Sequence, residues 1–306
     1  MDWALLITQL VNGLQYGILL FLLAAGLTLV FGIMDFINLA HGSFYMVGAY
    51  FCATLIQITG SFLLSVVAAF GGVFILGLLV EYLLIRRLYS FDHLYQVLAT
   101  VGLILIFDTL VQLIWGVTGK SIPLPEILSG QYQIGSLVFA SYRLVIISTG
   151  LLVAVGLYIL IARTRLGMLI RAGASNRTMA SALGVNINRL YWIVFALGVA
   201  LAGLAGMLVA PISQASVGMG NQIIIVALVV VIVGGIGSVQ GAFYAALIIG
   251  MIDSLGRSYL EDFMYLLMPA QNAETAAPAI SAMLIYIVMA VVLVFRPEGL
   301  FPPKTR

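Results

Sequence analysis

Apolar runs long enough to cross a lipid bilayer recur along the whole chain. One of them, from Leu144 to Ile161, contains no charged residue. About 20 helical residues at 1.5 Å each span the ~30 Å hydrocarbon layer. Charged residues make up only 8% of the sequence, against about 25% in soluble domains, so these runs must face lipid. Strands of a transmembrane barrel would alternate apolar and polar residues. We therefore expect an all-α polytopic membrane protein.

The apolar runs divide the chain into nine candidate spans. They are Leu5–Ile33, Phe44–Ile58, Phe62–Ile85, Leu94–Trp115, Leu144–Ile161, Leu190–Ala210, Ile223–Val233, Ala242–Leu255 and Ile280–Phe295. The second and seventh are too short for a complete crossing. The sequence predicts one transmembrane domain over residues 1–306, with eight to nine helices and two interrupted segments.

The basic residues sort by side of the membrane. Ten fall on one face: Arg86, Arg87, Arg163, Arg165, Arg171, Arg177, Arg189, Arg296, Lys304 and Arg306. Only Lys120, Arg143 and Arg257 fall on the other. The positive-inside rule makes the first face cytoplasmic, which puts the N-terminus outside and the C-terminus inside. The first thirty residues contain no Lys or Arg, unlike a signal peptide, so we expect the first span to be retained.

Each short span lies beside a polar or glycine-rich break. The first break is MDFINLAHGS, from Met34 to Ser43, and the second is GGIGSVQG, from Gly234 to Gly241. Irregular backbone at membrane depth is tolerated only inside protein or beside a water-filled cavity, and interrupted segments often mark a transporter's substrate path. The breaks lead into GSFY and GAFY, a weak internal repeat. From the second break we take as candidate path residues Gly234, Gly235, Gly237, Gln240 and Gly241.

Three polar residues of the first break are spaced by three, namely Asp35, Asn38 and His41. They share one face if the stretch is helical, where with Gly42 they would line the path or hold the break in shape. In the alternative, Asp35 lies at the cytoplasmic headgroups and His41 caps the next helix.

Other polar residues lie within the spans themselves. Asn12 and Gln15 on the first span either meet the first break or bond a neighbouring helix. Glu81 and Asp253 lie near span ends, where we expect them to snorkel, whereas Asp108 has no evident partner. Small residues four apart form a ridge that favours close helix packing: Gly198, Ala202, Gly206 and Ala210.

The one long basic loop covers residues 163–189 and includes Arg171. Within it, Ser175 or Asn176 can cap a short helix that runs to Leu183 and ends at Gly184. Such a helix is too short to be stable alone in water, so it must dock. Its apolar face, predicted to comprise Met179, Ala180 and Leu183, would meet the protein's own helix ends, lipid headgroups, or a groove on a cytoplasmic partner.

Several chemistries are excluded by the residues. The tripeptide Gly119–Ser121 ends like a phosphate loop, but Ile114 stands where that loop needs glycine. A serine hydrolase built on Ser43 and His41 would need side chains that diverge in a helix. The single cysteine and two histidines make a metal site improbable, and a net charge of +2 does not suggest a nucleic-acid partner. We expect no enzyme activity; a passive channel remains an alternative.

Four stretches together resemble permease subunits of branched-chain amino-acid ABC importers, in particular the shorter of the two paired permeases. They are Asn12–Tyr50, the loop Arg163–Arg189, GGIGSVQGAF from Gly234, and FRPEGLF from Phe295 to Phe301. Asn38, Ala40, His41 and Gly42 form the core of the first signature. Ser43 stands where many relatives are expected to carry an acidic residue.

The resemblance implies a set of partners in a bacterial inner membrane. These are a second homologous permease, two cytoplasmic ATPase subunits that bind ATP-Mg, a periplasmic substrate-binding protein and membrane lipid, with no cofactor on this chain. It implies that residues around Ala180 and Gly184 meet the ATPase. The solute would be a small amino acid, branched-chain or related; the family also serves urea, short amides and small carboxylates. The outer loops, predicted at residues 116–142 and 256–279, are the expected docking surface for the binding protein.

Overall fold

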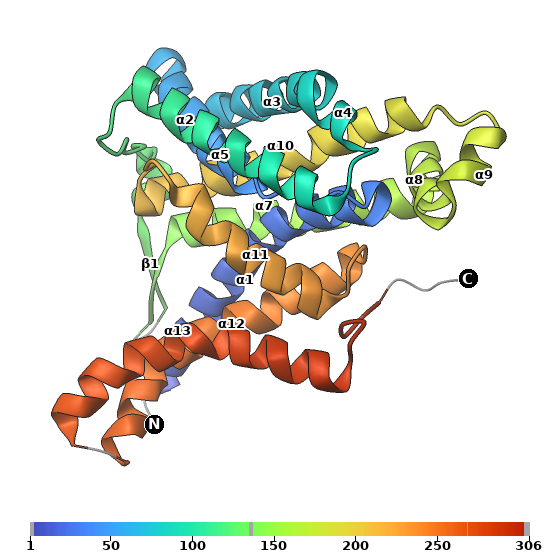
Figure 1. Cartoon of the computed structure of the whole chain (residues 1–306). Coiled ribbons are helices and arrows are strands. Elements are labelled where there is room, and N and C mark those ends of the chain that lie inside the picture. Colours follow the sequence, from blue (N-terminus) through green and yellow to red (C-terminus); the bar gives the residue numbers. More distant parts are fainter. Residues whose placement is uncertain (1–2, 135–136, 268, 303–306) are drawn as a thin grey trace.

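A computed structural model describes residues 3–134, 137–267 and 269–302. The chain is almost entirely helical (Figure 1), as expected. Its elements are α1 (Trp3–Met34), α2 (His41–Thr59), α3 (Phe62–Val80), the π-helical turn η1 (Glu81–Ile85), α4 (Arg86–Leu88), α5 (His93–Trp115), α6 (Glu126–Ser129), β1 (Gln131–Ile134), β2 (Leu137–Ala140), α7 (Ser141–Arg163), α8 (Arg165–Ser175), α9 (Arg177–Ala182), α10 (Ile187–Ser213), α11 (Met219–Gly234), α12 (Val239–Tyr265) and α13 (Ala270–Phe295). Strands β1 and β2 pair antiparallel in a small hairpin.

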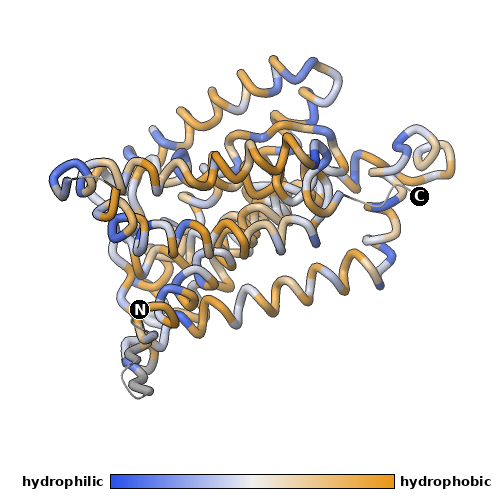
Figure 2. Tube along the Cα trace, turned by 90° about the horizontal axis from the view of Figure 1, so that it is seen from below, coloured by the Kyte–Doolittle hydropathy of each residue, from blue (hydrophilic) through white to orange (hydrophobic). Residues whose placement is uncertain are grey.

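The described residues contain 7 helices long and apolar enough to cross a membrane. They are α1, α3 with its continuation to Leu88, α5, α7, α10, α12 and α13. The 16 residues of α11 form a shorter apolar helix, and α2 has 19 residues. Figure 2 shows the hydrophobic colour along the helices, with hydrophilic residues concentrated at their ends. Each predicted span therefore corresponds to a helix.

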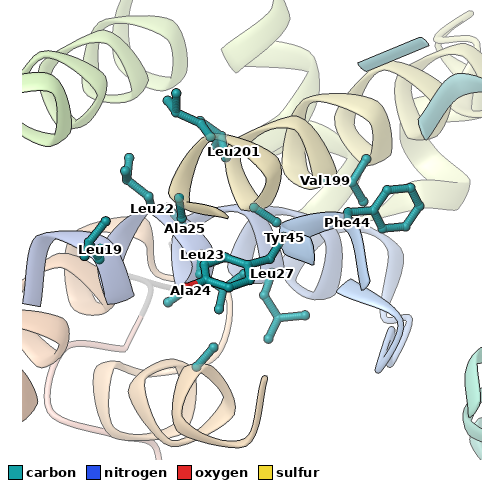
Figure 3. Packing of buried hydrophobic residues seen from close by; sticks show 14 of the residues in the cluster. Leu19, Leu22, Leu23, Ala24, Ala25, Leu27, Phe44, Tyr45, Val199 and Leu201 are labelled. Carbon is teal, nitrogen blue, oxygen red and sulfur yellow. The ribbon is translucent and has the colours of Figure 1, made fainter. Parts of the chain in front are cut away.

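Helices α1 and α10 form the centre of the bundle. In the most apolar 18-residue stretch of each helix, 89% of α1 and 83% of α10 is buried inside the protein. The corresponding share is only 22% for α3 and for α5, 17% for α7 and 11% for α13. Side chains of α1, α2 and α10 interlock at the core (Figure 3). The peripheral helices turn apolar faces outward, as a lipid environment requires.

The predicted ridge of small residues on α10 is confirmed as a packing surface. A Cβ atom added at Gly198 would lie 2.8 Å from the carbonyl oxygen of Gly26 on α1. One added at Gly206 would overlap the backbone of Tyr45 on α2. Because these glycines lack a side chain, α10 approaches both central neighbours at backbone contact.

The predicted outer loop at residues 256–279 is wrong, because most of it is helical. Helix α12 continues to Tyr265 and α13 begins at Ala270, so the two form a hairpin that extends beyond the bundle at the N-terminal end (Figure 1). Met264 and Ala273 belong to a small separate apolar core in this hairpin. Hydropathy measures preference for lipid, and a polar segment can still be a good helix former.

The prediction that Glu81 and Asp253 snorkel is also wrong. Glu81 is completely buried; Arg86 lies 3.0 Å from its carboxylate and the Tyr89 hydroxyl donates to it at 2.8 Å. Asp253 is buried as well, with Arg257 one turn away at 2.9 Å. A cation nearby in sequence lets each carboxylate remain inside the protein.

The two ends of the bundle differ in charge, as predicted. The described arginines of the larger group gather where α4, α8, α9 and the end of α13 lie, at the right of Figure 1. Arg143 and Arg257 lie near the opposite end, with β1 and the N-terminus. Lys304 and Arg306 fall outside the described residues.

Candidate functional site

The first break is a non-helical connection between α1 and α2. Helix α1 ends at Met34, and Asp35 has the left-handed φ of 51°. Residues 35–38 have no regular secondary structure and residues 39–40 form a turn, so the condition for Asp35, Asn38 and His41 to share the face of one continuous helix is not met.

This connection leads back into the bundle rather than along its end. The Nε2 atom of His41, the first residue of α2, lies 3.2 Å from the carbonyl oxygen of Leu23 on α1. Leu23 precedes the end of α1 at Met34 by three turns, or about 16 Å along the helix axis. Helix α2 therefore begins deep within the helix bundle.

The polar residues of the first break diverge. Asp35 is exposed, and its carboxylate lies 4.0 Å from Nε2 of His93 at the start of α5. Asn38 is buried, and neither its amide nitrogen nor its oxygen has a hydrogen-bond partner. The buried Ser43 hydroxyl also lacks one, as does Nδ1 of His41. Among the described residues, no group of three His, Cys, Asp or Glu side chains could hold a metal ion.

The beginnings of α2 and α11 touch each other. A Cβ atom at Gly42 or Gly220 would overlap the carbonyl group of the other glycine. Neither helix has a side-chain cap at its N-terminus. Because α2 begins deep in the bundle, α11 does as well. Two helices thus begin within the membrane at one point, although they are more than 170 residues apart in sequence.

An acidic residue that had no predicted partner lies beside this junction. The amide of Asn221, in the first turn of α11, donates to Oδ2 of Asp108 on α5 at 3.0 Å. Asp108 is half-buried and Asn221 is exposed. Asp108 lies 15 residues after the start of α5 and seven before its end at Trp115, or about 23 Å and about 10 Å along the helix axis, so it lies within the span and nearer the end at Trp115. A carboxylate in the middle of an apolar helix is the sequence signal for this site; its partner is not visible in the sequence.

The second break is a short turn between two helices. Helix α11 ends at Gly234, and Gly235 and Gly237 adopt φ values of 102° and 83°, which favour glycine. The backbone amides of Leu300 and Phe301 donate to the carbonyl groups of Val233 and Gly234 at 2.8 and 3.1 Å. The chain's own C-terminal segment therefore covers the end of α11.

Helix α12 begins directly against this turn. The hydroxyl of Ser238 caps it by accepting from the amide of Gly241 at 3.0 Å. Gly241 packs on the backbone of Gly234, and Gln240 is exposed. A Cβ atom at Gly32 would lie 2.6 Å from the Cα of Gly237, so this turn lies near the end of α1. The two breaks flank α1 at different depths.

Asn12 and Gln15 precede Leu23, the residue that His41 of the first break contacts, by about 16 and 12 Å along the axis of α1. Asn12 donates to Oε1 of Gln9 at 3.0 Å and accepts a hydrogen bond from Arg143 on α7. It therefore bonds a neighbouring helix, which was one of the two alternatives. Gln15, one turn further along α1, is half-buried.

The basic loop contains two helices rather than one. Asn176, not Ser175, is the cap of α9, and its side chain accepts from the amide of Met179 at 2.9 Å. Gly184 ends the turn with a φ of 89°. Helix α8 was not predicted, although Thr164 caps it in the same way. Arg171 of α8 donates to the carbonyl of Ile161, near the end of α7.

The predicted apolar face of the short helix is divided. Ala180 is buried within the loop and does not belong to its outer surface. Met179 and Leu183 are 59% and 79% exposed. Two large apolar side chains thus project from the basic end of the molecule, where they are available to a docking partner.

Two helices that begin inside the bundle are surrounded by helices long and apolar enough to cross a membrane, which is the architecture of a polytopic membrane protein. The chain matches the family model described as "Branched-chain amino acid transport system / permease component" over residues 9–293. It belongs to this family.

Curated relatives cover most of the chain. It is 31% identical to the high-affinity branched-chain amino acid transport system permease protein BraD of Pseudomonas aeruginosa, over 95% of this chain and 94% of the relative. It is 30% identical to the LivH permease protein of Escherichia coli K12, over 82% and 86%. A probable LivH of Methanocaldococcus jannaschii is 31% identical over 80% and 79%. No solved structure matches the chain. These similarities make it a transport subunit rather than an enzyme.

Proposed function

We propose that this chain is one permease of an inner-membrane ABC importer for a small amino acid, branched-chain or related. Its family and the names of its relatives support this substrate class. A second homologous permease, two ATPase subunits that bind ATP-Mg and a periplasmic binding protein would complete the importer. The alternatives are a passive channel and an importer of the same family for urea, short amides or small carboxylates.

The proposed orientation follows from charge. With the basic end in the cytoplasm, the N-terminus lies outside and the C-terminus inside. Helices α8 and α9 then face the ATPase subunits, and the β1–β2 hairpin and the α12–α13 hairpin face the binding protein. The second hairpin carries exposed Glu261, Asp262 and Glu274, which could pair with basic residues of that protein.

The proposed substrate path follows the α5–α11 face, and the Asp108–Asn221 pair is the observation that carries it. A charged side chain in the middle of a span costs about 2.5–3.5 kcal/mol against lipid on insertion scales. Asp108 is only half-buried by the chain and Asn221 is exposed, so this face would meet water or a partner rather than acyl chains. The α2–α11 junction and the unpaired polar atoms of Asn38 and Ser43 belong to the same region.

Thiol labelling tests the path. In a chain with Cys52→Ala, a cysteine introduced by Asn221→Cys should react with a membrane-impermeant reagent, at a rate that depends on nucleotide and substrate. The matched control is Leu152→Cys on α7, which is 73% exposed at the midpoint of that helix, away from both ends of the span, and should stay unlabelled. Equal labelling of both cysteines, or none at Asn221→Cys in any state, would refute the path.

The coupling proposal concerns Met179 and Leu183. Replacing Leu183 by Asp should lower ATP-driven uptake at least tenfold in proteoliposomes that contain the complete importer, while membrane insertion and permease pairing remain normal. The control is Arg163→Gln at the end of α7, which should have little effect.

Two further measurements distinguish the alternatives. Copurification with two ATPase chains distinguishes an importer from a channel, and a comparison of leucine uptake with urea uptake distinguishes the substrates.

A further inference from the structure

A groove at the basic end of the molecule lies outside the proposed path. It has a volume of about 670 Å³ and is formed by α3 with η1 on one side and the start of α10 on the other. Six of the residues that line it are Ile75, Leu79, Tyr82, Arg86, Arg189 and Trp192. In Figure 1, α3 runs along the upper edge of the molecule, away from α12 and α13.

The groove changes character along its length. Ile75 and Leu79 on α3 are 58% and 51% exposed, and they give the deeper part an apolar wall. Tyr82 and Trp192 follow toward the basic end, where the indole of Trp192 donates to the carbonyl of Leu78 at 2.8 Å. Aromatic side chains of this kind are enriched at the level of lipid headgroups. The groove thus passes from the hydrocarbon layer to the headgroup layer.

Its mouth carries a positive charge that the protein leaves uncompensated. Arg86 lies 5.1 Å from the centre of the Tyr82 ring, and the buried Glu81 neutralises it at 3.0 Å. Arg189 is exposed and forms no salt bridge within the described residues. Asn186 and Asn188 also line the mouth. The guanidinium of Arg189 and the side-chain amides of Asn186 and Asn188 are hydrogen-bond donors that can bind the oxygen atoms of a phosphate ester.

We propose that this groove binds an anionic phospholipid of the leaflet at the α8–α9 end. Its phosphate would lie at Arg189 and one acyl chain along Ile75 and Leu79. Charge complementarity favours this occupant over a helix of another subunit, because an apolar helix would leave Arg189 unpaired. Basic pockets between helices on this side of a membrane bind anionic headgroups. The inference does not depend on which solute the permease carries.

Lipid binding to the purified full-length chain tests the proposal. Native mass spectrometry would compare phosphatidylglycerol with phosphatidylcholine of the same acyl chains. Phosphatidylglycerol should bind more tightly, and Arg189→Gln should weaken it about fivefold, the effect expected for one basic residue near a charged headgroup. Phosphatidylcholine binding should stay unchanged. The matched control is Arg87→Gln, which removes the same charge from an exposed position that does not line the groove.

A second variant tests the apolar part of the groove. Ile75→Trp fills it and should weaken both lipids, while the melting temperature of the chain stays within a few degrees. Equal affinity of the native chain for the two lipids would overturn the proposal. So would equal losses in Arg189→Gln and Arg87→Gln, which indicate diffuse surface charge. Loss of the preference when the complete importer is measured would assign the groove to another subunit.

Discussion

The two breaks in the hydrophobic pattern lead to different structures. In the first, residues 35–40 enter the bundle and leave the polar atoms of Asn38 buried without partners. In the second, residues 235–238 form a turn near the end of α1, and Leu300 and Phe301 bond the carbonyl groups at the end of α11. The last carbonyl groups of a helix have no hydrogen-bond donor within the helix itself, so they need donors from elsewhere, which Leu300 and Phe301 supply here.

The two breaks differ in whether their polar groups have hydrogen-bond partners, and this difference indicates which break supports the fold and which is a candidate for function. Buried polar groups in native proteins almost always have a hydrogen-bond partner, and exceptions call for an explanation. The carbonyl groups at the second break have partners within the chain, so we expect its glycines to serve the fold. The first break has buried polar atoms without hydrogen-bond partners, on Asn38 and Ser43, beside the α2–α11 junction. A solute or water molecule there would supply the missing hydrogen bonds. Four experiments can break or sharpen this contrast.

The largest effect is expected at the junction itself. Gly220→Ala places a methyl group against the carbonyl of Gly42 and should cost about 3 kcal/mol of unfolding free energy, the upper part of the usual range for overpacking. The control Gly71→Ala on α3 meets no atom within 4 Å and should be neutral or slightly stabilising. Unfolding in mixed detergent would measure both. Equal stabilities would mean that the two helix starts are not in contact.

The second effect concerns the C-terminal segment. Deleting residues 299–306 removes the two hydrogen bonds to α11 and should cost about 2 kcal/mol, at about 1 kcal/mol each. If this break is structural, uptake per folded molecule should remain normal. A large loss of uptake in a chain of unchanged stability would instead assign the second break to the path.

The third effect separates transport from stability. Asn38→Leu removes two unpaired polar atoms, so the unfolding free energy should not fall. Uptake should drop about tenfold, equivalent to about 1.4 kcal/mol, if those atoms contact solute or water. Uptake in proteoliposomes and unfolding of the same preparation test both parts. Normal uptake in this variant would make the first break structural too.

The smallest effect is at the cap of α12. Ser238→Ala removes the acceptor for the amide of Gly241 and should cost about 1 kcal/mol, with uptake unchanged. Thermal unfolding of the purified chain measures the loss, and Ser238→Asp, which can still cap, should restore it. A variant that is fully stable would show that the cap contributes nothing.

The sequence predicts features that depend on neighbouring residues, such as helices and their caps, but it does not predict contacts between residues far apart in the chain. Helical spans follow from hydropathy, and the cap at Asn176 follows from a contact three residues away. The depth at which α2 begins depends on its contact with Leu23, and the partner of Asp108 lies 113 residues along the chain. Neither is encoded in a local pattern. The sequence also left open what the apolar face of α9 meets; Ala180 is buried within the chain while Met179 and Leu183 stay exposed, a division that depends on how the whole loop folds.

The central position of α1 has a consequence for synthesis. Its packing partners α10 and α12 begin only at Ile187 and Val239. At 5–20 residues per second, roughly eight to thirty seconds of translation separate the end of α1 from the start of α10. During that interval the most enclosed helix of the finished protein must wait in lipid, with its glycine contact surfaces open to other nascent segments. Any chaperone or insertase that shields this permease should therefore recognise its first helix.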